Sequence, residues 1–206
     1  MRALLHRRRV LAGLAALCCA PALSQHRHEP RPAAPDPLAT RFGGPFSLID
    51  HHGRPVADSG FRGRFMLVYF GFTRCTDTCP VDLPIIAQAL DRLGPLAESV
   101  VPLFVTVDPA HDTPAVLAPY VAAFHPRLIG LTGSEAEIAA VARAYKVHRR
   151  KLTLPHHGAG HYAVDHGSLT YLMGKDGLFV TLLPHNSGAG RMEQVLRRHL
   201  AQDIGR

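Results

Sequence analysis

Two nearly continuous apolar runs dominate the hydrophobic pattern of this chain. Residues 65–71 (FMLVYFG) and 100–107 (VVPLFVTV) contain almost no polar side chain, which is typical of strands that are buried on both faces of a sheet. A different spacing follows the first run, because apolar residues recur every three or four positions over 83–90. This spacing predicts a helix at 80–93 with one apolar face, and the Gly-Pro pair that comes next is expected to end it.

Weaker patterns predict the other elements. Ser134 and Glu137 stand three residues apart at the start of an apolar-periodic stretch, which is the pattern of a capping box. Gly-Lys-Asp-Gly at 174–177 separates two short apolar segments and predicts a hairpin. The remaining expected elements, in chain order, are a strand at 46–49, a helix at 114–124, a strand at 127–131, a helix at 134–145, a His-rich hairpin or long loop at 146–165, hairpin strands at 169–173 and 178–183, and a helix at 189–202.

The order of these elements predicts the fold class. Strands alternate with helices, and a hairpin and a helix close the chain, which favours an α/β protein with a central mixed sheet flanked by helices. A strand that ends in a cysteine-bearing loop before a helix is the arrangement of a thioredoxin-like fold. The His-containing segment at 146–165 is expected as an insertion in that fold.

The first 24 residues have the pattern of an export signal. Basic residues at 7–9 precede an apolar stretch at 10–23, and small residues stand where a signal peptidase reads the chain. The apolar stretch is shorter than the roughly 20 residues of a membrane-spanning helix. Cleavage, retention as a membrane anchor, and lipidation at Cys18 or Cys19 are the three alternatives that this pattern leaves open.

The rest of the chain divides into a tether and one domain. Residues 25–41 are Pro-rich and polar, which predicts a flexible tether. The folded domain is expected to span 42–206, a size that one core can stabilise without disulfides. With an export signal in front, the domain is expected in the periplasm or on the outer face of the cytoplasmic membrane.

The charge of the chain does not support nucleic-acid binding. The formal charge is +7, but residues 1–24 hold four arginines and no acid, so the remainder carries only +3. Nucleic-acid partners are therefore not expected. A local basic cluster remains at 146–151 (KVHRRK). Such clusters are solvated surface in most proteins, and in others they dock an acidic partner.

Cysteine usage directs attention to one loop. The chain has four cysteines, and only Cys75 and Cys79 lie outside the expected signal. One close pair is not the framework of a disulfide-stapled domain. The pair stands at the expected start of a helix, where the helix dipole favours the thiolate. A thiolate attacks disulfides and also binds soft metals, so a redox pair and a metal site are both open.

A histidine further along the chain is a candidate third ligand. His166 stands just before the expected strand at 169–173, and in a thioredoxin-like fold that approach lies beside the cysteine loop. Two thiolates and an imidazole suit Cu(I) and can also hold Cu(II), whereas zinc would ordinarily take a fourth ligand. His156, His157 and His161 compete with His166 in the same region.

These motifs together resemble the SCO/SenC family of copper-binding, thioredoxin-fold assembly factors for cytochrome c oxidase. The resemblance covers residues 42–203. It rests on the following segments, in order: YFGFT at 69–73, the Cys75-x-x-x-Cys79-Pro80 loop, VDP at 107–109, DTP at 112–114, FHP at 124–126, GLTG at 130–133 and VDH at 164–166. Cys-x-x-x-Cys alone would be far less specific.

The resemblance implies a function and a ligand set. It implies a copper chaperone that binds copper through Cys75, Cys79 and His166 and delivers it to the copper-centre subunit of cytochrome c oxidase, or to another cuproprotein or copper chaperone. It also implies that the two cysteines cycle between dithiol and disulfide. The chain departs from the usual family pattern at Arg74, His111 and Gly167. None of these three positions is a ligand, and they are expected among the groups that orient the ligands.

Two other functions compete with copper delivery. A thiol–disulfide oxidoreductase would use Cys75 and Cys79 to keep the cysteines of a cuproprotein reduced, and His166 would then tune the pKa of a thiol. A peroxidase of the peroxiredoxin type also places a reactive cysteine after a buried strand, but it needs no histidine from position 166. Membrane association is expected only through the N-terminus.

Overall fold

Seven strands form the central sheet in the computed structural model, which describes residues 37–153 and 162–204. In sheet order the strands are β2 (Pro55–Ala57), β1 (Ser47–Asp50), β5 (Ile129–Thr132), β4 (Val100–Thr106), β3 (Phe65–Gly71), β8 (Thr170–Met173) and β9 (Phe179–Leu183). Strands β3, β4 and β5 run parallel, and the other pairings are antiparallel. The predicted mixed sheet is confirmed.

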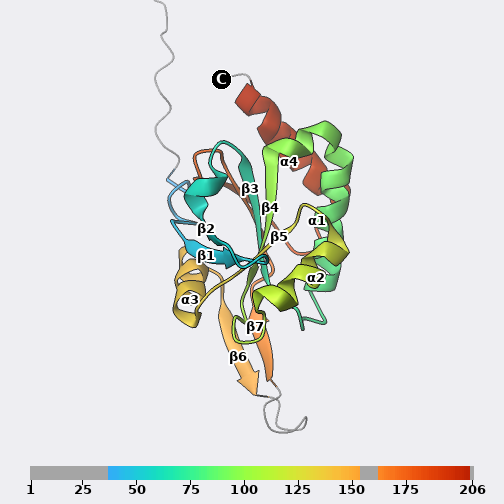
Figure 1. Ribbon diagram of the computed structural model, residues 1–206. Helices are drawn as coiled ribbons and strands as arrows, with labels where there is room; N and C mark the ends of the chain where they lie inside the picture. The colour runs from blue at the N-terminus through green and yellow to red at the C-terminus, as the bar shows by residue number, and fades with distance from the viewer. Residues whose placement is uncertain (1–36, 154–161, 205–206) are drawn as a thin grey trace, which may run out of the picture. The chain divides into compact units, whose positions relative to one another are not determined.

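Helices cover both faces of this sheet (Figure 1). Helices α1 (Cys79–Leu93), α2 (Pro114–Phe124) and α4 (Ala189–Ile204) pack against one face, and α3 (Glu135–Ala144) packs against the other. Two 3-10 turns, Asp58–Phe61 and Gly94–Ser99, complete the helical segments of the described residues. Layers of helix, sheet and helix are the thioredoxin-like arrangement that the sequence predicts.

Strand β3 is buried on both faces, as its apolar run predicts. Side chains of a strand alternate between the two faces. Phe65, Leu67 and Tyr69 accordingly belong to the core under α1 and α4, whereas the residues between them belong to the core on the α3 side. The strand therefore has no solvated face, and its central position holds the loop that follows it firmly in place.

The carboxyl ends of β3 and β4 meet at one edge of the sheet. Gly71 pairs with Thr106 in register, and the Val107 amide donates to the Gly71 carbonyl at 2.7 Å. Parallel neighbours end at the same edge, so the loop at 72–78 and the loop at 107–113 lie side by side. The cysteine loop is thus next to the Asp108 segment.

A separate two-stranded sheet carries His166. The segment expected as a hairpin or a long loop is a hairpin of β6 (Arg149–Thr153) and β7 (Tyr162–His166), and it pairs with no strand of the central sheet. Figure 1 shows it projecting from the edge of the sheet. His166 is the last residue of β7. His156, His157 and His161 lie outside the described residues.

Several boundaries differ from the sequence prediction. Strand β2 was not predicted, since three residues that begin with Pro55 give no periodic pattern and proline is tolerated at a sheet edge. Strand β5 begins two residues later than expected, at Ile129. The capping box of α3 is present, because the Glu137 amide donates to Ser134 Oγ and the Ser134 amide donates to Glu137.

The first described residues of the domain already contact the sheet. The Ala39 carbonyl accepts a hydrogen bond from the Phe179 amide, and the Phe42 ring packs 4.7 Å from the Phe179 ring. The expected signal at 1–24 and most of the expected tether at 25–41 lie outside the described residues. Among the helices within 37–153 and 162–204, none combines the length and apolar character needed to cross a membrane.

Candidate functional site

The cysteine loop connects β3 directly to α1. Its turn is closed by a hydrogen bond from the Cys75 amide to the Phe72 carbonyl, at 3.1 Å. Helix α1 begins at Cys79, one residue before the predicted start, and Pro80 occupies its first turn, where a missing N–H costs no hydrogen bond. Cys79 is therefore fixed by the helix and fully buried, whereas Cys75 is half-buried on the loop.

Gly71 gives the Cys79 sulfur the space that it occupies. A β-carbon at position 71 would lie 2.6 Å from Cys79 Sγ and 2.8 Å from the Phe104 ring. Both neighbours are buried, so neither can move away without disturbing the core. The glycine at the end of β3 is thus required by the close approach of the sulfur.

Substitution of Gly71 by alanine is expected to destabilise the reduced protein by about 1–3 kcal/mol, the usual cost of overpacking a core. The measurement is the urea midpoint of the metal-free dithiol form. Gly60→Ala is the matched control, because nothing lies within 4 Å of a β-carbon there. Equal midpoints for the two variants would contradict this account of Gly71.

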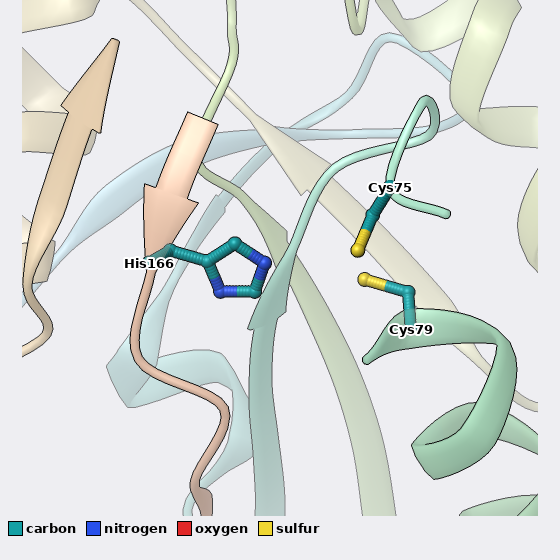
Figure 2. A group of neighbouring side chains, drawn as sticks. All are labelled: Cys75, Cys79 and His166. Atoms are coloured by element: carbon teal, nitrogen blue, oxygen red, sulfur yellow. The ribbon is translucent and has the colours of Figure 1, made fainter. Parts of the chain in front are cut away.

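Cys75, Cys79 and His166 converge on one point. Figure 2 shows the two sulfurs facing each other and the imidazole ring pointing toward them from β7. The three ligand atoms lie within 4.8 Å of one another. The structure thus brings together the three residues that the sequence singled out as candidate ligands.

The orientation of the His166 ring follows from its neighbours. Nδ1 lies 3.0 Å from the Gly167 carbonyl, which can only accept a hydrogen bond, so Nδ1 carries the proton of that bond. The ring also packs edge-on against Phe72, with centroids 5.7 Å apart. Nε2 is consequently free of this bond and available to a metal or to the thiols.

The two cysteines have opposite electrostatic environments. A hydrogen bond from the Cys79 thiol lowers the pKa of Cys75 far below that of an ordinary cysteine, and the hydrogen bond from His166 lowers it further. The same Cys79–Cys75 hydrogen bond, together with burial, raises the pKa of Cys79. Burial favours the neutral form of His166, but its hydrogen bonds with Cys75 and with the Gly167 carbonyl, together with the charges of Cys75 and Asp165, outweigh this and raise its pKa. The metal-free pair therefore consists of a Cys75 thiolate and a Cys79 thiol.

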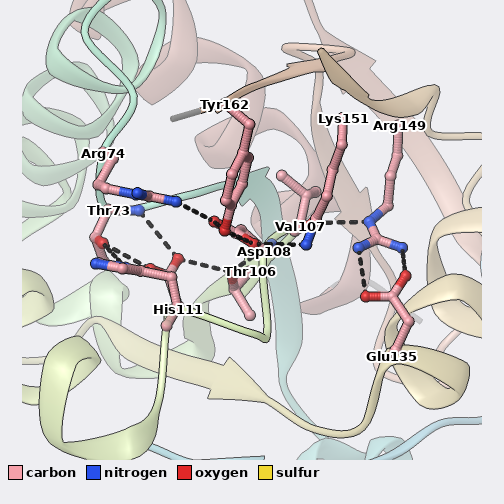
Figure 3. A network of polar contacts seen from close by, with 11 residues as sticks. Thr73, Arg74, Thr106, Val107, Asp108, His111, Glu135, Arg149, Lys151 and Tyr162 are labelled. Atoms are coloured by element: carbon pink, nitrogen blue, oxygen red, sulfur yellow. Dashed lines mark hydrogen bonds and ion pairs between the residues drawn. The ribbon is translucent and has the colours of Figure 1, made fainter. Parts of the chain in front are cut away.

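Asp108 connects the cysteine loop to the hairpin (Figure 3). Its buried carboxylate accepts hydrogen bonds from Arg74 at 3.0 Å and from the Tyr162 hydroxyl at 2.7 and 2.8 Å, and Lys151 Nζ lies 3.3 Å away. Burial alone would raise the pKa of Asp108, but the bonds from Tyr162, Arg74 and Lys151 hold it below its ordinary value. The carboxylate is thus ionised and shared by three segments.

A second buried carboxylate, Asp112, holds the start of the cysteine loop. It accepts from the Thr73 amide at 3.0 Å, from the Thr73 hydroxyl at 2.6 Å and from the Thr106 hydroxyl at 2.7 Å. His111 Nδ1 lies 2.9 Å from the same carboxylate. The 107–113 loop therefore fixes the cysteine loop at two successive residues, Thr73 and Arg74.

The three departures from the family pattern have clear places in this structure. Arg74 and His111 contact the carboxylates of Asp108 and Asp112. Gly167 has space for a side chain, since the nearest atom to an added β-carbon is 4.0 Å away. Two departures thus belong to the polar network around the site, and the third leaves a space beside His166.

The basic cluster at 146–151 is largely paired inside the domain. Arg149 forms an ion pair with Glu135 and donates to the Val107 carbonyl at 2.7 Å. Lys151 pairs with Asp108, and Arg150 lies 3.8 Å from Asp165. These contacts account for three of its four cations, so the cluster does more than cover a solvated surface.

Sequence reasoning missed Asp108 and Tyr162 as members of the site. Asp108 stands in VDP at 107–109, a segment that carries the resemblance, whereas Tyr162 stands two residues before VDH and outside those segments. A signal was present, because an Asp that directly follows a buried strand lies at the sheet edge where the cysteine loop also begins. Pairing it with a tyrosine 54 residues away required the structure.

The fold and the site together define a class of protein: a thioredoxin-like domain with a dithiol and an imidazole gathered at a helix N-terminus. Comparison with known proteins narrows this class. The family model described as SCO1/SenC matches residues 34–201. The chain therefore belongs to the SCO1/SenC family.

Relatives and solved structures agree with this assignment. The mitochondrial SCO2 homolog of Bos taurus is 44% identical over 160 residues, which are 77% of this chain and 59% of the relative. Copper-bound ScoI of Arabidopsis thaliana superposes with a TM-score of 0.73 at 39% identity, covering 78% of this chain and 99% of that one. Copper-bound ScoI of Bradyrhizobium japonicum gives a TM-score of 0.71, also at 39% identity, over 76% and 98%. The chain thus spans about three fifths of the bovine relative and nearly all of the two solved domains.

Proposed function

We propose that this chain is a copper-binding assembly protein that holds Cu(I) through Cys75, Cys79 and His166 and passes it to a cuproprotein. The observation that carries this proposal is the convergence of the three donor atoms within 4.8 Å. Family membership supports it, and so do the two similar domains whose structures contain copper. The copper-centre subunit of cytochrome c oxidase is the proposed recipient, with another cuproprotein or copper chaperone as the alternative.

The donor set suits copper as a cargo. Two thiolates and one imidazole are soft ligands that favour Cu(I), and the same set can hold Cu(II). Zinc would ordinarily complete a tetrahedron, but within the described residues no fourth His, Cys, Asp or Glu joins this group. A site with three protein ligands leaves copper open on one side. Because Cys75 is half-buried on a loop, a recipient's thiol can reach the metal there and displace the ligands in steps.

The location and domain organisation are part of the same proposal. Residues 1–24 would act as a signal peptide or membrane anchor, 25–41 as a tether, and 42–206 as the copper-binding domain, outside the cytoplasmic membrane. This part rests on the N-terminal sequence pattern alone. The bovine relative is described as mitochondrial, so its name does not support a periplasmic location.

A thiol–disulfide reductase is the second candidate, and the contrast between the two cysteines favours it. The Cys75 thiolate would attack a disulfide of the partner and form a mixed disulfide, releasing one partner thiolate. Cys79 would then lose its proton and attack Cys75 Sγ, which forms the Cys75–Cys79 disulfide and releases the second partner thiol. The lowered pKa of Cys75 and the raised pKa of Cys79 fit these two roles.

Substitution of His166 by alanine is expected to weaken Cu(I) binding by more than about 10- to 100-fold, the loss that follows removal of a group that only orients a ligand, because one of three ligands is itself lost while both thiolates remain. The measurement is an anaerobic Cu(I) titration against a competing chelator. His148→Ala is the matched control: His148 lies beside the same hairpin, but its exposed side chain pairs with Asp165 and does not belong to the group of three candidate ligands. An unchanged affinity in His166→Ala would remove His166 from the ligand set.

A further inference from the structure

We propose that Asp108 is a positioning residue that fastens the β6–β7 hairpin to the cysteine loop and so sets the place of His166 relative to Cys75. The effect of Asp108 on copper binding rests on the proposed function, because it requires that the site holds copper. The fastening itself is a property of the metal-free protein.

Strand β7 links Asp108 and the copper site by its own periodicity. Tyr162, Val164 and His166 are alternate residues of one strand, so their side chains point to the same face. Val164 is buried in the core, Tyr162 donates to Asp108, and His166 points toward the cysteines. Tyr162 and His166 stand about 13 Å apart along a strand that rises roughly 3.3 Å per residue. A strand held at Tyr162 and Val164 has little freedom left at His166.

The hairpin depends on this contact more than a strand of the central sheet would. No ladder hydrogen bonds join β6 or β7 to the seven-stranded sheet. Among the contacts of the described residues, two polar anchors hold the hairpin to the 107–113 loop. One is the Asp108 cluster, and the other is Arg149, which reaches the Val107 carbonyl. Both anchors attach to adjacent residues of that loop, Val107 and Asp108.

Asp108 is a rigid point of attachment. Its carboxylate is fully buried, and its amide donates to the Thr106 hydroxyl at 2.9 Å. The Thr106 hydroxyl in turn donates to Asp112, which binds Thr73 of the cysteine loop. The carboxylate is therefore braced by the same loop that braces the residues before Cys75.

Three groups from three segments contact this one carboxylate at the same time. Arg74 comes from the cysteine loop, Lys151 from β6 and Tyr162 from β7. Arg74 and Lys151 also lie over the Tyr162 ring, 4.5 and 4.8 Å from its centroid. Without the negative charge at 108, the two cations would repel each other across that ring. The carboxylate thus offsets the repulsion between Arg74 and Lys151 and joins the cysteine loop to the hairpin.

The test compares Asp108→Asn with wild type, first in the metal-free, reduced state and then with copper bound. Hydrogen exchange at the amides of 162–166 is expected to become at least about tenfold faster, since a charge-assisted cluster closing a local unit is lost. Cu(I) affinity is expected to fall by about 10- to 100-fold, the usual effect of removing a group that orients a ligand. The Cu(II)–thiolate absorption band is expected to shift, because the imidazole no longer meets the metal at the same angle.

Asp58→Asn is the matched control. Asp58 is also buried, pairs with Arg62 at 2.7 Å and accepts from the Phe46 amide at 3.1 Å, and none of these bonds involves the described residues of the hairpin. It is expected to lower the urea midpoint without changing β7 exchange or the absorption band. If Asp58→Asn reproduces both changes, or if a folded Asp108→Asn shows neither, the positioning role is overturned.

Tyr162→Phe is a second variant that tests the positioning role if Asp108→Asn does not fold. This variant removes one hydroxyl and keeps the ring under Arg74 and Lys151, so it is expected to loosen β7 with little change in global stability. Wild-type exchange at 162–166 in Tyr162→Phe would overturn the proposal. The hydrogen exchange is measured without metal, so this result does not depend on copper binding. If the wild type bound no copper, the proposed function would be rejected. Faster exchange in the variants would still support the positioning role.

Discussion

Alkylation of the metal-free, reduced protein is expected at Cys75 and not at Cys79, at a rate that stays nearly constant as the pH falls from about 8 to about 6. Only the thiolate reacts. The Cys79 hydrogen bond and His166 hold the pKa of Cys75 well below that range, so Cys75 remains ionised throughout. An ordinary cysteine, with a pKa near 8.5, would lose reactivity by about 100-fold over the same interval.

The sign of the shift decides the direction of the pH effect. A lowered pKa means that the rate falls only at acidic pH, where Cys75 finally takes up a proton. The raised pKa and burial of Cys79 keep it protonated, so it should react only after unfolding. The measurement is iodoacetamide labelling at several pH values, with the labelled cysteine located by mass spectrometry. In the unfolded protein both cysteines should show the ordinary profile, which serves as the internal control.

His166→Ala tests the cause of the shift. Removing the imidazole takes away one hydrogen bond to the Cys75 thiolate but leaves the bond from Cys79, the larger cause. The reactive profile of Cys75 should therefore move toward higher pH without reaching that of the unfolded chain. A Cys75 profile in the folded wild type that matches the unfolded one would show that the pair does not share a proton in this way.

The sequence predicted the buried parts of the fold better than the exposed ones. Strands β3 and β4 were placed almost to the residue, because an uninterrupted apolar run of this length is stable only where both faces of the strand are buried. Strand β2 and the ends of β6 were missed. Strand β2 has three residues, and β6 is mostly charged, so neither buries enough apolar surface to leave a periodic trace.

The site was predictable only in part, for a similar reason. Cys75, Cys79 and His166 have side chains whose chemistry is rare enough to be noticed without a structure. Asp108 does not, since an Asp-Pro pair after a strand is a common turn. Its role depends on a tyrosine 54 residues away and on a lysine in a polar strand. Contacts between such ordinary residues come from tertiary folding and not from local pattern.

Substitution of Cys79 by serine is expected to weaken Cu(I) binding by about 1,000-fold or more, which corresponds to about 4 kcal/mol. Copper loses a soft thiolate and gains a hydroxyl that binds Cu(I) poorly. The serine hydroxyl can still donate to the Cys75 thiolate, as the Cys79 thiol does in the wild type. The alkylation profile of Cys75 should therefore remain close to that of the wild type. A large loss of copper with an intact Cys75 thiolate would show that the second sulfur is a ligand and not only a hydrogen-bond donor.

The same variant, set beside His166→Ala, separates copper delivery from thiol reduction. Cys79→Ser can neither hold copper tightly nor close a disulfide, so it should fail in both roles and stop a reductase at the mixed disulfide. His166→Ala keeps the dithiol and loses only an imidazole. In cells that lack the chain, assembly of the oxidase copper centre is the measurement. If delivery is the task, both variants fail, because each binds copper too weakly to transfer it. If reduction is the task, His166→Ala restores assembly and Cys79→Ser does not, and the metal site would then be secondary to the two sulfurs.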